Sequence, residues 1–177
     1  MSAAQLLRAF HDASAHCLHV EPAEWQFPPL EPVQVICHSD YAPYNCVFRN
    51  GEAVAIIDFD CARPGPRSWD LAYALYRFAP FMNPHNPDSF GNITEQSVRA
   101  RKFLDSYGAD RSLRQETVNT LTVRLRALTD FMRAAAQHDE NFAHHIAQGH
   151  LAAYLNDIAY MENHEHVLHD VIVGPID

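Results

Sequence analysis

One stretch of the sequence concentrates the side chains that could do chemistry. It runs from His38 through Asp40 to Asn45, and the acids Asp58 and Asp60 follow on the next apolar segment. Two carboxylates and an amide converge on one point if the chain between them folds back as a hairpin. Mg²⁺ prefers oxygen ligands from one or two carboxylates and leaves its other positions to water and phosphate. The pattern therefore indicates a site for a hard divalent cation, with Asp40 free to act as a base toward a hydroxyl.

Short runs rich in β-branched residues surround this stretch and predict the elements that position it. Residues 33–37 and 53–57 are typical of strands, and Val47-Phe48 leads into a tight turn at 49–51. A β-hairpin is therefore expected to carry the acids. The segment Arg63-Pro-Gly-Pro66 is then expected to break the chain.

The rest of the chain is predicted to be helical. Apolar residues spaced by three and four indicate an amphipathic helix from Ala3 to Cys17, and a Pro-rich segment over 21–32 is expected to be extended. Further helices are expected over 68–79, 93–107, 112–137 and 140–169. The end signals are Ser68 as a cap, capping boxes at Asn92 with Glu95 and at Ser112 with Gln115, and Gly108 as a C-cap.

Five motif elements in order resemble the aminoglycoside phosphotransferase and choline kinase-like family, which has a protein-kinase-like fold. That family has H-G-D-x-x-P-x-N, then a strand ending I-D-[FW]-[DE], then G-P or G-D, then D-L-A at the start of a helix. This chain has His38-Ser-Asp40, Pro43-Tyr-Asn45, Ile57-Asp58-Phe-Asp60, Gly65-Pro66 and Asp70-Leu-Ala72.

The resemblance implies a role for each matched residue. Asp40 would be the catalytic base that orients the acceptor hydroxyl, and His38 would brace the same loop. Asn45 and Asp58 would be the Mg²⁺ ligands. Asp70 would be a structural acid that bonds back to the catalytic loop without touching substrate.

The resemblance also implies substrates and a cofactor. The reaction would be Mg²⁺-dependent transfer of the ATP γ-phosphoryl group to a hydroxyl of a small molecule. The helices after Asp70 would supply the acceptor site, with Tyr73, Asp157 and Glu162 as candidate contacts. Ser39 replaces the usual glycine of the loop, and this affects the backbone conformation expected there.

The resemblance covers only the C-terminal lobe of that fold. The residues before His38 are predicted to form one helix and a Pro-rich connection, the six glycines do not cluster, and the sole lysine, Lys102, lies in a later helix. We therefore expect an α+β, mainly α, kinase-like C-lobe with a short β-hairpin and four to five packed helices. The ATP-binding N-lobe, with its Gly-rich loop and lysine, is expected to be absent.

Composition limits the remaining possibilities. A chain of 177 residues with 47% hydrophobic and 20% charged residues is expected to fold as a single domain over 1–177. Its 13 basic and 22 acidic residues give a net charge of −9, which disfavours nucleic acid and favours a cationic ligand. The start of the sequence has neither a signal peptide pattern nor a membrane span, and its four cysteines show no C-x-x-C pair, so we expect a cytoplasmic protein with no membrane partner.

Two other functions remain open at this stage. A non-catalytic kinase-like module would use the same cleft to bind a small ligand or a partner. Loss of an N-lobe would uncover apolar surface, which a homodimer or a separate chain covering the cleft would bury. A metal-dependent phosphohydrolase would instead use Asp40 to activate water.

Overall fold

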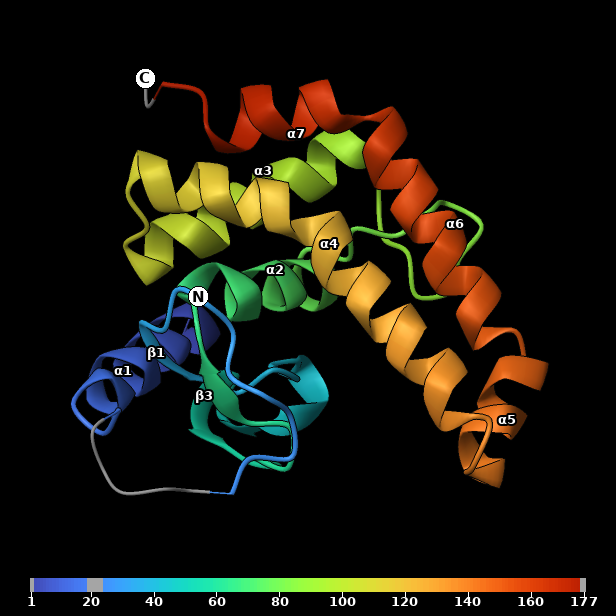
Figure 1. Ribbon diagram of the computed structural model, residues 1–177. Helices are drawn as coiled ribbons and strands as arrows, with labels where there is room; N and C mark the ends of the chain where they lie inside the picture. Colours follow the sequence, from blue (N-terminus) through green and yellow to red (C-terminus); the bar gives the residue numbers. More distant parts are fainter. Residues whose placement is uncertain (1, 19–23, 176–177) are drawn as a thin grey trace.

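The structure, a computed structural model, describes residues 2–18 and 24–175, so part of the predicted Pro-rich connection, residues 21–23, lies outside it (Figure 1). Helices dominate the described part, which confirms the mainly α, α+β class. In chain order the elements are α1 (Ser2–Ala15), β1 (Val35–Cys37), the 3₁₀ helix η1 (Pro43–Asn45), β2 (Cys46–Arg49), β3 (Glu52–Ile56), β4 (Arg63–Gly65), α2 (Arg67–Phe78), α3 (Ile93–Tyr107), α4 (Arg111–Ala135), α5 (Glu140–Ala147), α6 (His150–Asn163) and α7 (Glu165–Ile172).

Two small antiparallel sheets flank the predicted chemical residues, which lie in the segments that connect the strands. β2 and β3 form the expected hairpin, and its turn residues Asn50 and Gly51 both have positive φ angles, as tight two-residue hairpin turns require. β1 pairs with β4, placing Val35 opposite Gly65. The prediction that 63–66 only breaks the chain is therefore wrong. A proline is tolerated in β4 because this strand has just one neighbour and leaves an edge free.

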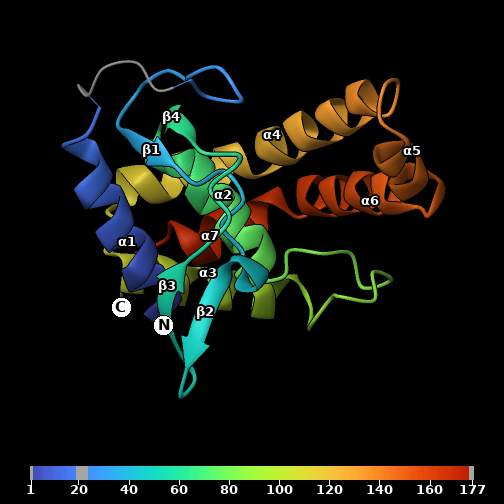
Figure 2. The same cartoon turned by 90° about the horizontal axis from the view of Figure 1, so that it is seen from below.

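Helix α2 forms the centre of the fold. Every residue from Ser68 to Tyr76 is buried, as expected for a helix covered on all sides. It packs against α4 most extensively and also against α3 and β1, and Figure 2 shows it lying between the strands and the later helices. Asp70 therefore lies in the first turn of the most buried helix of the molecule.

The predicted single helix over 140–169 is instead three helices, which raises the number in the described residues to seven. Gly149 separates α5 from α6 with a left-handed φ of 92°, a conformation that favours glycine and stops helical hydrogen bonding. His164 separates α6 from α7, and its ring bonds the Tyr160 carbonyl at 2.8 Å. Apolar residues continue at helical spacing across both breaks, so the spacing alone did not reveal them.

The predicted helix ends agree with the structure in part. The capping box of Asn92 and Glu95 and the left-handed C-cap at Gly108 are both confirmed. The expected cap at Ser112 is wrong, because the Asp110 carboxylate accepts from the Leu113 N–H at 2.8 Å and starts α4 earlier. Ser68 also does not cap α2, which begins directly after Pro66.

Candidate active site

A buried carboxylate fixes the loop that carries Asp40. Asp70 Oδ1 accepts from the Ser39 N–H at 2.6 Å, and Oδ2 accepts from the His38 N–H at 2.6 Å. The same Oδ2 lies 3.0 Å from Nε2 of His11. Burial opposes ionisation, but these hydrogen bonds outweigh it and hold the pKa of Asp70 below its usual value. An ionised carboxylate thus ties the loop to the start of α2.

His11 was missed by the sequence reasoning. It is fully buried in α1, and its Nδ1 lies 2.7 Å from the Tyr107 hydroxyl, which also accepts from Arg67 at 2.9 Å. This geometry assigns the ring proton to Nε2, facing the Asp70 carboxylate, while Nδ1 accepts from Tyr107. The available signal was the position of His11 four residues after Leu7, on the apolar face of α1.

Ser39 adopts the backbone conformation that the usual glycine would provide. Its φ angle is 66°, in the left-handed region that costs a side-chain-bearing residue about 1–2 kcal/mol. Its N–H bonds Asp70 and its carbonyl accepts from the guanidinium of Arg124. The hydroxyl is buried and has no partner within the described residues. The loop therefore keeps a glycine-like shape although a serine occupies it.

His38 links the loop to the end of the hairpin. The ring is fully buried, its Nδ1 accepts from the Asp40 N–H at 3.2 Å, and its Nε2 donates to the Ile57 carbonyl at 2.9 Å. Because Ile57 directly precedes Asp58, the His38 ring connects the backbone at Asp40 to the backbone next to Asp58. His38 acts on Asp40 through the backbone rather than through its carboxylate.

The Asp40 carboxylate lies between two donors. Its Oδ1 accepts from the Tyr44 hydroxyl at 2.9 Å, and its Oδ2 accepts from Nδ2 of Asn45 at 2.9 Å. Nδ2 of Asn45 also donates to the Asp40 carbonyl, which fixes the amide orientation. A carboxylate has about four acceptor sites, so Asp40 can still accept from a further hydroxyl.

Asn45 and Asp58 provide the oxygen donors that the sequence predicted for Mg²⁺. The Asn45 carbonyl accepts from the Ile57 N–H at 3.1 Å, so Asn45 lies across the hairpin from the residue before Asp58. The amide oxygen of Asn45 accepts no hydrogen bond from the described residues, since the nitrogen makes both bonds to Asp40. Asp58 is exposed and has a left-handed φ of 67°.

This donor set fits a magnesium ion chemically. One amide oxygen and one carboxylate leave most positions of an octahedral ion to water and phosphate, which is the usual arrangement for Mg²⁺. In the described part of the chain, no three His, Cys, Asp or Glu side chains are grouped as a metal site. A cage built from protein ligands alone, as for structural zinc, is therefore not what these residues form.

A cavity of about 530 Å³ opens beside Asp40 and extends between the loop and helices α4, α5 and α6. Its lining includes Ser39, Asp40, Tyr44 and Tyr73, so the predicted acceptor contact at Tyr73 faces this space. The Tyr73 hydroxyl lies 3.0 Å from that of Tyr44, which in turn bonds Asp40. The loop that carries Asp40 and the side chain of Tyr73 thus meet at one end of the cavity.

Asp157 and Glu162, the other predicted acceptor contacts, do not line this cavity. Asp157 is fully buried and accepts from Tyr76, from the backbone of Asn83 and from the side chain of Asn86, at 2.7 to 2.9 Å. Burial raises its pKa despite these bonds. Glu162 forms an exposed ion pair with Arg126 at 2.6 Å. The structure thus places Asp157 as an anchor for the loop before α3 and Glu162 on the surface.

Comparisons with known proteins match the first half of the chain to a family and a longer stretch to one curated relative. Residues 2–89 match the model of the phosphotransferase enzyme family, and the match includes α1, both small sheets and α2. The predicted family resemblance is therefore confirmed over that segment. The chain is also 32% identical over 122 residues to the trifolitoxin immunity protein of Rhizobium leguminosarum bv. trifolii. That alignment covers 66% of this chain and 47% of the relative, so the chain spans about half of the relative's length. No solved structure matches the chain significantly.

Proposed function

We propose that this chain, whose residues 2–89 match the phosphotransferase enzyme family, is a kinase-like C-lobe that transfers a phosphoryl group from ATP to a hydroxyl of a small molecule. The observation that carries the proposal is the position of Asp40. Its carboxylate lines a cavity large enough for a small acceptor and is hydrogen-bonded to Asn45, the candidate metal ligand. We further propose that residues 1–177 form one domain and that the reaction takes place in the cytoplasm. None of the described helices is long and apolar enough to cross a bilayer.

In this mechanism Asp40 holds the acceptor hydroxyl and takes its proton as the oxygen attacks the γ-phosphorus of ATP. A new bond forms between that oxygen and phosphorus while the bond to the leaving ADP oxygen breaks. Asn45 and Asp58 would hold Mg²⁺, which when bound supplies charge neutralisation on the phosphates. His38 and Asp70 keep the Asp40 backbone in place and make no contact with the substrate.

The curated relative bears on the kind of acceptor. Its name states that it confers immunity to trifolitoxin. Phosphorylation of a hydroxyl adds charge and bulk, which can abolish the activity of a small toxic compound. We therefore propose a toxic small molecule as the acceptor class for this chain.

Calorimetric titration of Mg-ATP into the whole chain tests the proposal. We expect binding to the wild type, loss of binding in Asp58→Asn, and unchanged binding in Asp88→Asn, which alters an exposed loop acid away from the cavity. Asp40→Asn should still bind Mg-ATP but release no ADP in the presence of an acceptor. Absence of Mg-ATP binding in a folded wild type, or equal binding in Asp58→Asn, would refute the proposal.

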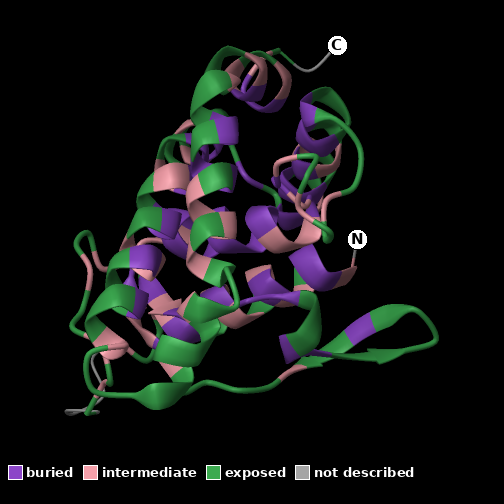
Figure 3. Ribbon diagram, turned by 90° about the vertical axis from the view of Figure 1, so that its right-hand side faces the viewer, coloured by how far each residue is buried: buried purple, intermediate pink, exposed green. Residues whose placement is uncertain are grey.

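An exposed apolar surface favours the alternative of a module that acts through a partner. Figure 3 shows the hairpin projecting from the helical body with most of its length exposed. The hairpin and the turn after it expose large apolar side chains, including Phe48, Ile57 and Phe59, each more than 40% accessible. Such patches commonly mark interaction sites. We propose a second copy of the chain as the partner, and sedimentation should reveal a dimer that Phe48→Ser weakens. A monomer at all concentrations would contradict it.

A further inference from the structure

The charges around the cavity differ from those of the whole chain. Asp40 is the only carboxylate among the described residues that line it, whereas Arg63, Arg124, His145 and His150 supply basic groups. The chain as a whole has a net charge of −9, which alone would favour a cationic ligand. The cavity is thus a basic region in an acidic protein.

Arg124 is the most informative of these groups. It is only 7% exposed, and one of its terminal nitrogens donates to the Ser39 carbonyl. Its guanidinium lies 4.6 Å from the ring centroid of Tyr73 and 5.0 Å from that of Trp69. Its Nε has no hydrogen-bond partner, and no carboxylate in the described residues forms an ion pair with it. Burying a cation without an anionic partner is costly, so a cation at a cavity wall favours an anionic ligand.

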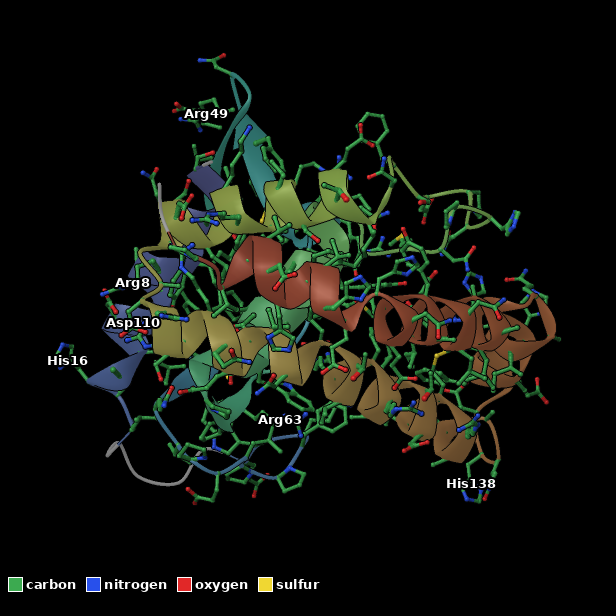
Figure 4. All side chains as sticks on the ribbon, turned by 90° about the horizontal axis from the view of Figure 1, so that it is seen from above. Arg8, His16, Arg49, Arg63, Asp110 and His138 are labelled. Atoms are coloured by element: carbon green, nitrogen blue, oxygen red, sulfur yellow. The ribbon has the colours of Figure 1, made fainter. Side chains whose placement is uncertain are left out.

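Arg63 places a second cation over the same aromatic ring. Its guanidinium lies 5.1 Å from the Trp69 centroid and 5.2 Å from that of Phe27, and its Nε also lacks a partner in the described part of the chain. Figure 4 shows Arg63 on the side of the molecule away from the hairpin tip, where Arg49 lies. Two guanidinium groups near one indole, neither paired with a carboxylate, strengthen the case for an anion at this wall.

The end of the cavity formed by α4 and α5 is mainly apolar, and His145 of α5 lies beside Phe142 there, with 6.3 Å between the ring centroids. This end is lined by Leu128, Phe131 and Met132 of α4 and by Phe142 of α5, whose ring packs edge-on against Phe131 at 5.3 Å. An apolar or aromatic group would be desolvated there. The cavity therefore combines one proton acceptor, two cations and an apolar end.

We propose that this cavity binds a hydroxylated carboxylate with an apolar or aromatic body. The hydroxyl lies at Asp40, the carboxylate at Arg124 with Arg63 beside it, and the apolar body along α4 between Leu128 and Phe142. Phosphorylation of that hydroxyl rests on the proposed function, but the preference of the cavity for an anion does not. The family match ends before α4, so Arg124 and the apolar wall lie outside the matched segment, whereas Arg63 lies within it.

Three matched probes test the inference without nucleotide. 3-Phenyllactate, its methyl ester and phenylalaninol share a hydroxyl and a phenyl ring but are anionic, neutral and cationic. Calorimetry on the wild-type chain at millimolar probe should give a Kd for phenyllactate at least tenfold below that for phenylalaninol, with the ester between them. Equal or tighter binding of phenylalaninol, or no binding of any probe, would overturn the inference.

Variants test whether the two arginines cause the preference for the anionic probe. Arg124→Gln should bring the ratio between the two charged probes close to one. Arg63→Gln should reduce it severalfold, which keeps the test open if the Arg124 variant does not fold. Arg126→Gln is the matched control, because Arg126 lies on the same helix but pairs with Glu162 at the surface, and it should leave the ratio unchanged. A preference that survives in folded Arg124→Gln and Arg63→Gln would refute the assignment.

The two proposals fail in distinguishable ways. If phenyllactate is preferred but Mg-ATP does not bind, the anion site stands and the phosphotransferase function is wrong. If Mg-ATP binds and depends on Asp58 but phenylalaninol is preferred, the function stands and the anionic acceptor is wrong.

Discussion

Replacing Asp70 by asparagine tests whether one buried carboxylate holds the catalytic loop in place. The substitution preserves the shape of the side chain and removes its charge and one acceptor oxygen. In the native protein Oδ1 serves the Ser39 N–H, and Oδ2 serves the His38 N–H and His11. An asparagine can place its side-chain oxygen where it accepts from both His38 and His11. Its NH₂ group then faces the Ser39 N–H, and two donors cannot bond each other.

The cost follows from that mismatch. Loss of a hydrogen bond to a charged acceptor costs about 1.5–3 kcal/mol, and a buried N–H left without an acceptor costs about 1–3 kcal/mol. These two costs overlap, because the same N–H is involved in both. His11 also loses a charged partner, although its ring can adopt the other tautomer. We therefore expect Asp70→Asn to lower the free energy of unfolding by about 3 kcal/mol near neutral pH.

Urea unfolding followed by circular dichroism measures this loss, and its pH dependence has a definite sign. The pKa of Asp70 is lowered in the folded protein, so its stabilising contribution is complete above its usual pKa of 3.8 and is lost as the pH falls through the native value. The difference between wild type and variant should be constant from about pH 7 to pH 5 and shrink below about pH 4. The control, Asp130→Asn, removes an exposed acid paired with Arg133 and should change stability by less than about 0.5 kcal/mol. A loss below about 1 kcal/mol for Asp70→Asn would refute the reasoning.

Three further substitutions, at two positions, test the same loop. Ser39→Gly should raise the free energy of unfolding by about 0.5–1 kcal/mol in urea titrations, because relief of the left-handed φ exceeds the entropy that glycine adds to the unfolded chain; a decrease would contradict this. His38→Asn and His38→Gln should each cost about 1–3 kcal/mol, because Gln leaves the partly buried N–H of Asp40 unpaired and Asn leaves the partly buried carbonyl of Ile57 unpaired. Only the Gln variant should speed amide hydrogen exchange at Asp40, and equal exchange in both would argue against the assigned ring geometry.

The sequence predicted the local features of the fold well because they depend on neighbouring residues. The hairpin turn at Asn50-Gly51, the capping box at Asn92 and the C-cap at Gly108 are each specified within a few residues, and each is confirmed. Strand β4 was missed because its pairing with Val35 is nonlocal and its sequence, Arg-Pro-Gly, has low strand propensity. The breaks in the 140–169 helix depend on one glycine and one histidine, which the apolar periodicity masks.

The candidate site shows the same division between local and nonlocal information. The spacing of Asp40, Asn45 and Asp58 was recognisable because the motif lies in a loop and the hairpin beside it. The contact of His11 with Asp70, which holds that loop, and the contact of Arg124 with Ser39 were not recognisable, because they join residues far apart in sequence, 85 residues apart for Arg124 and Ser39. Nothing in the periodicity of α4 marks one arginine as buried against aromatic rings, since Arg126 on the same helix is exposed.

This division explains why a family match supports a proposed reaction for this chain more readily than a proposed substrate. Residues 2–89 contain the loop, the hairpin and Asp70, which together position the groups expected to act on a phosphoryl group. The opposite wall of the cavity comes from α4, α5 and α6, after the matched segment ends. Selection on the acceptor can change Phe131 or Phe142 without removing a hydrogen bond from the loop that carries Asp40, whereas Arg124 also bonds the Ser39 carbonyl of that loop. The acceptor must therefore be inferred from the charge and shape of the whole cavity lining, in which Arg124 of α4 and Arg63 of β4 have no carboxylate partner among the described residues and favour an anion.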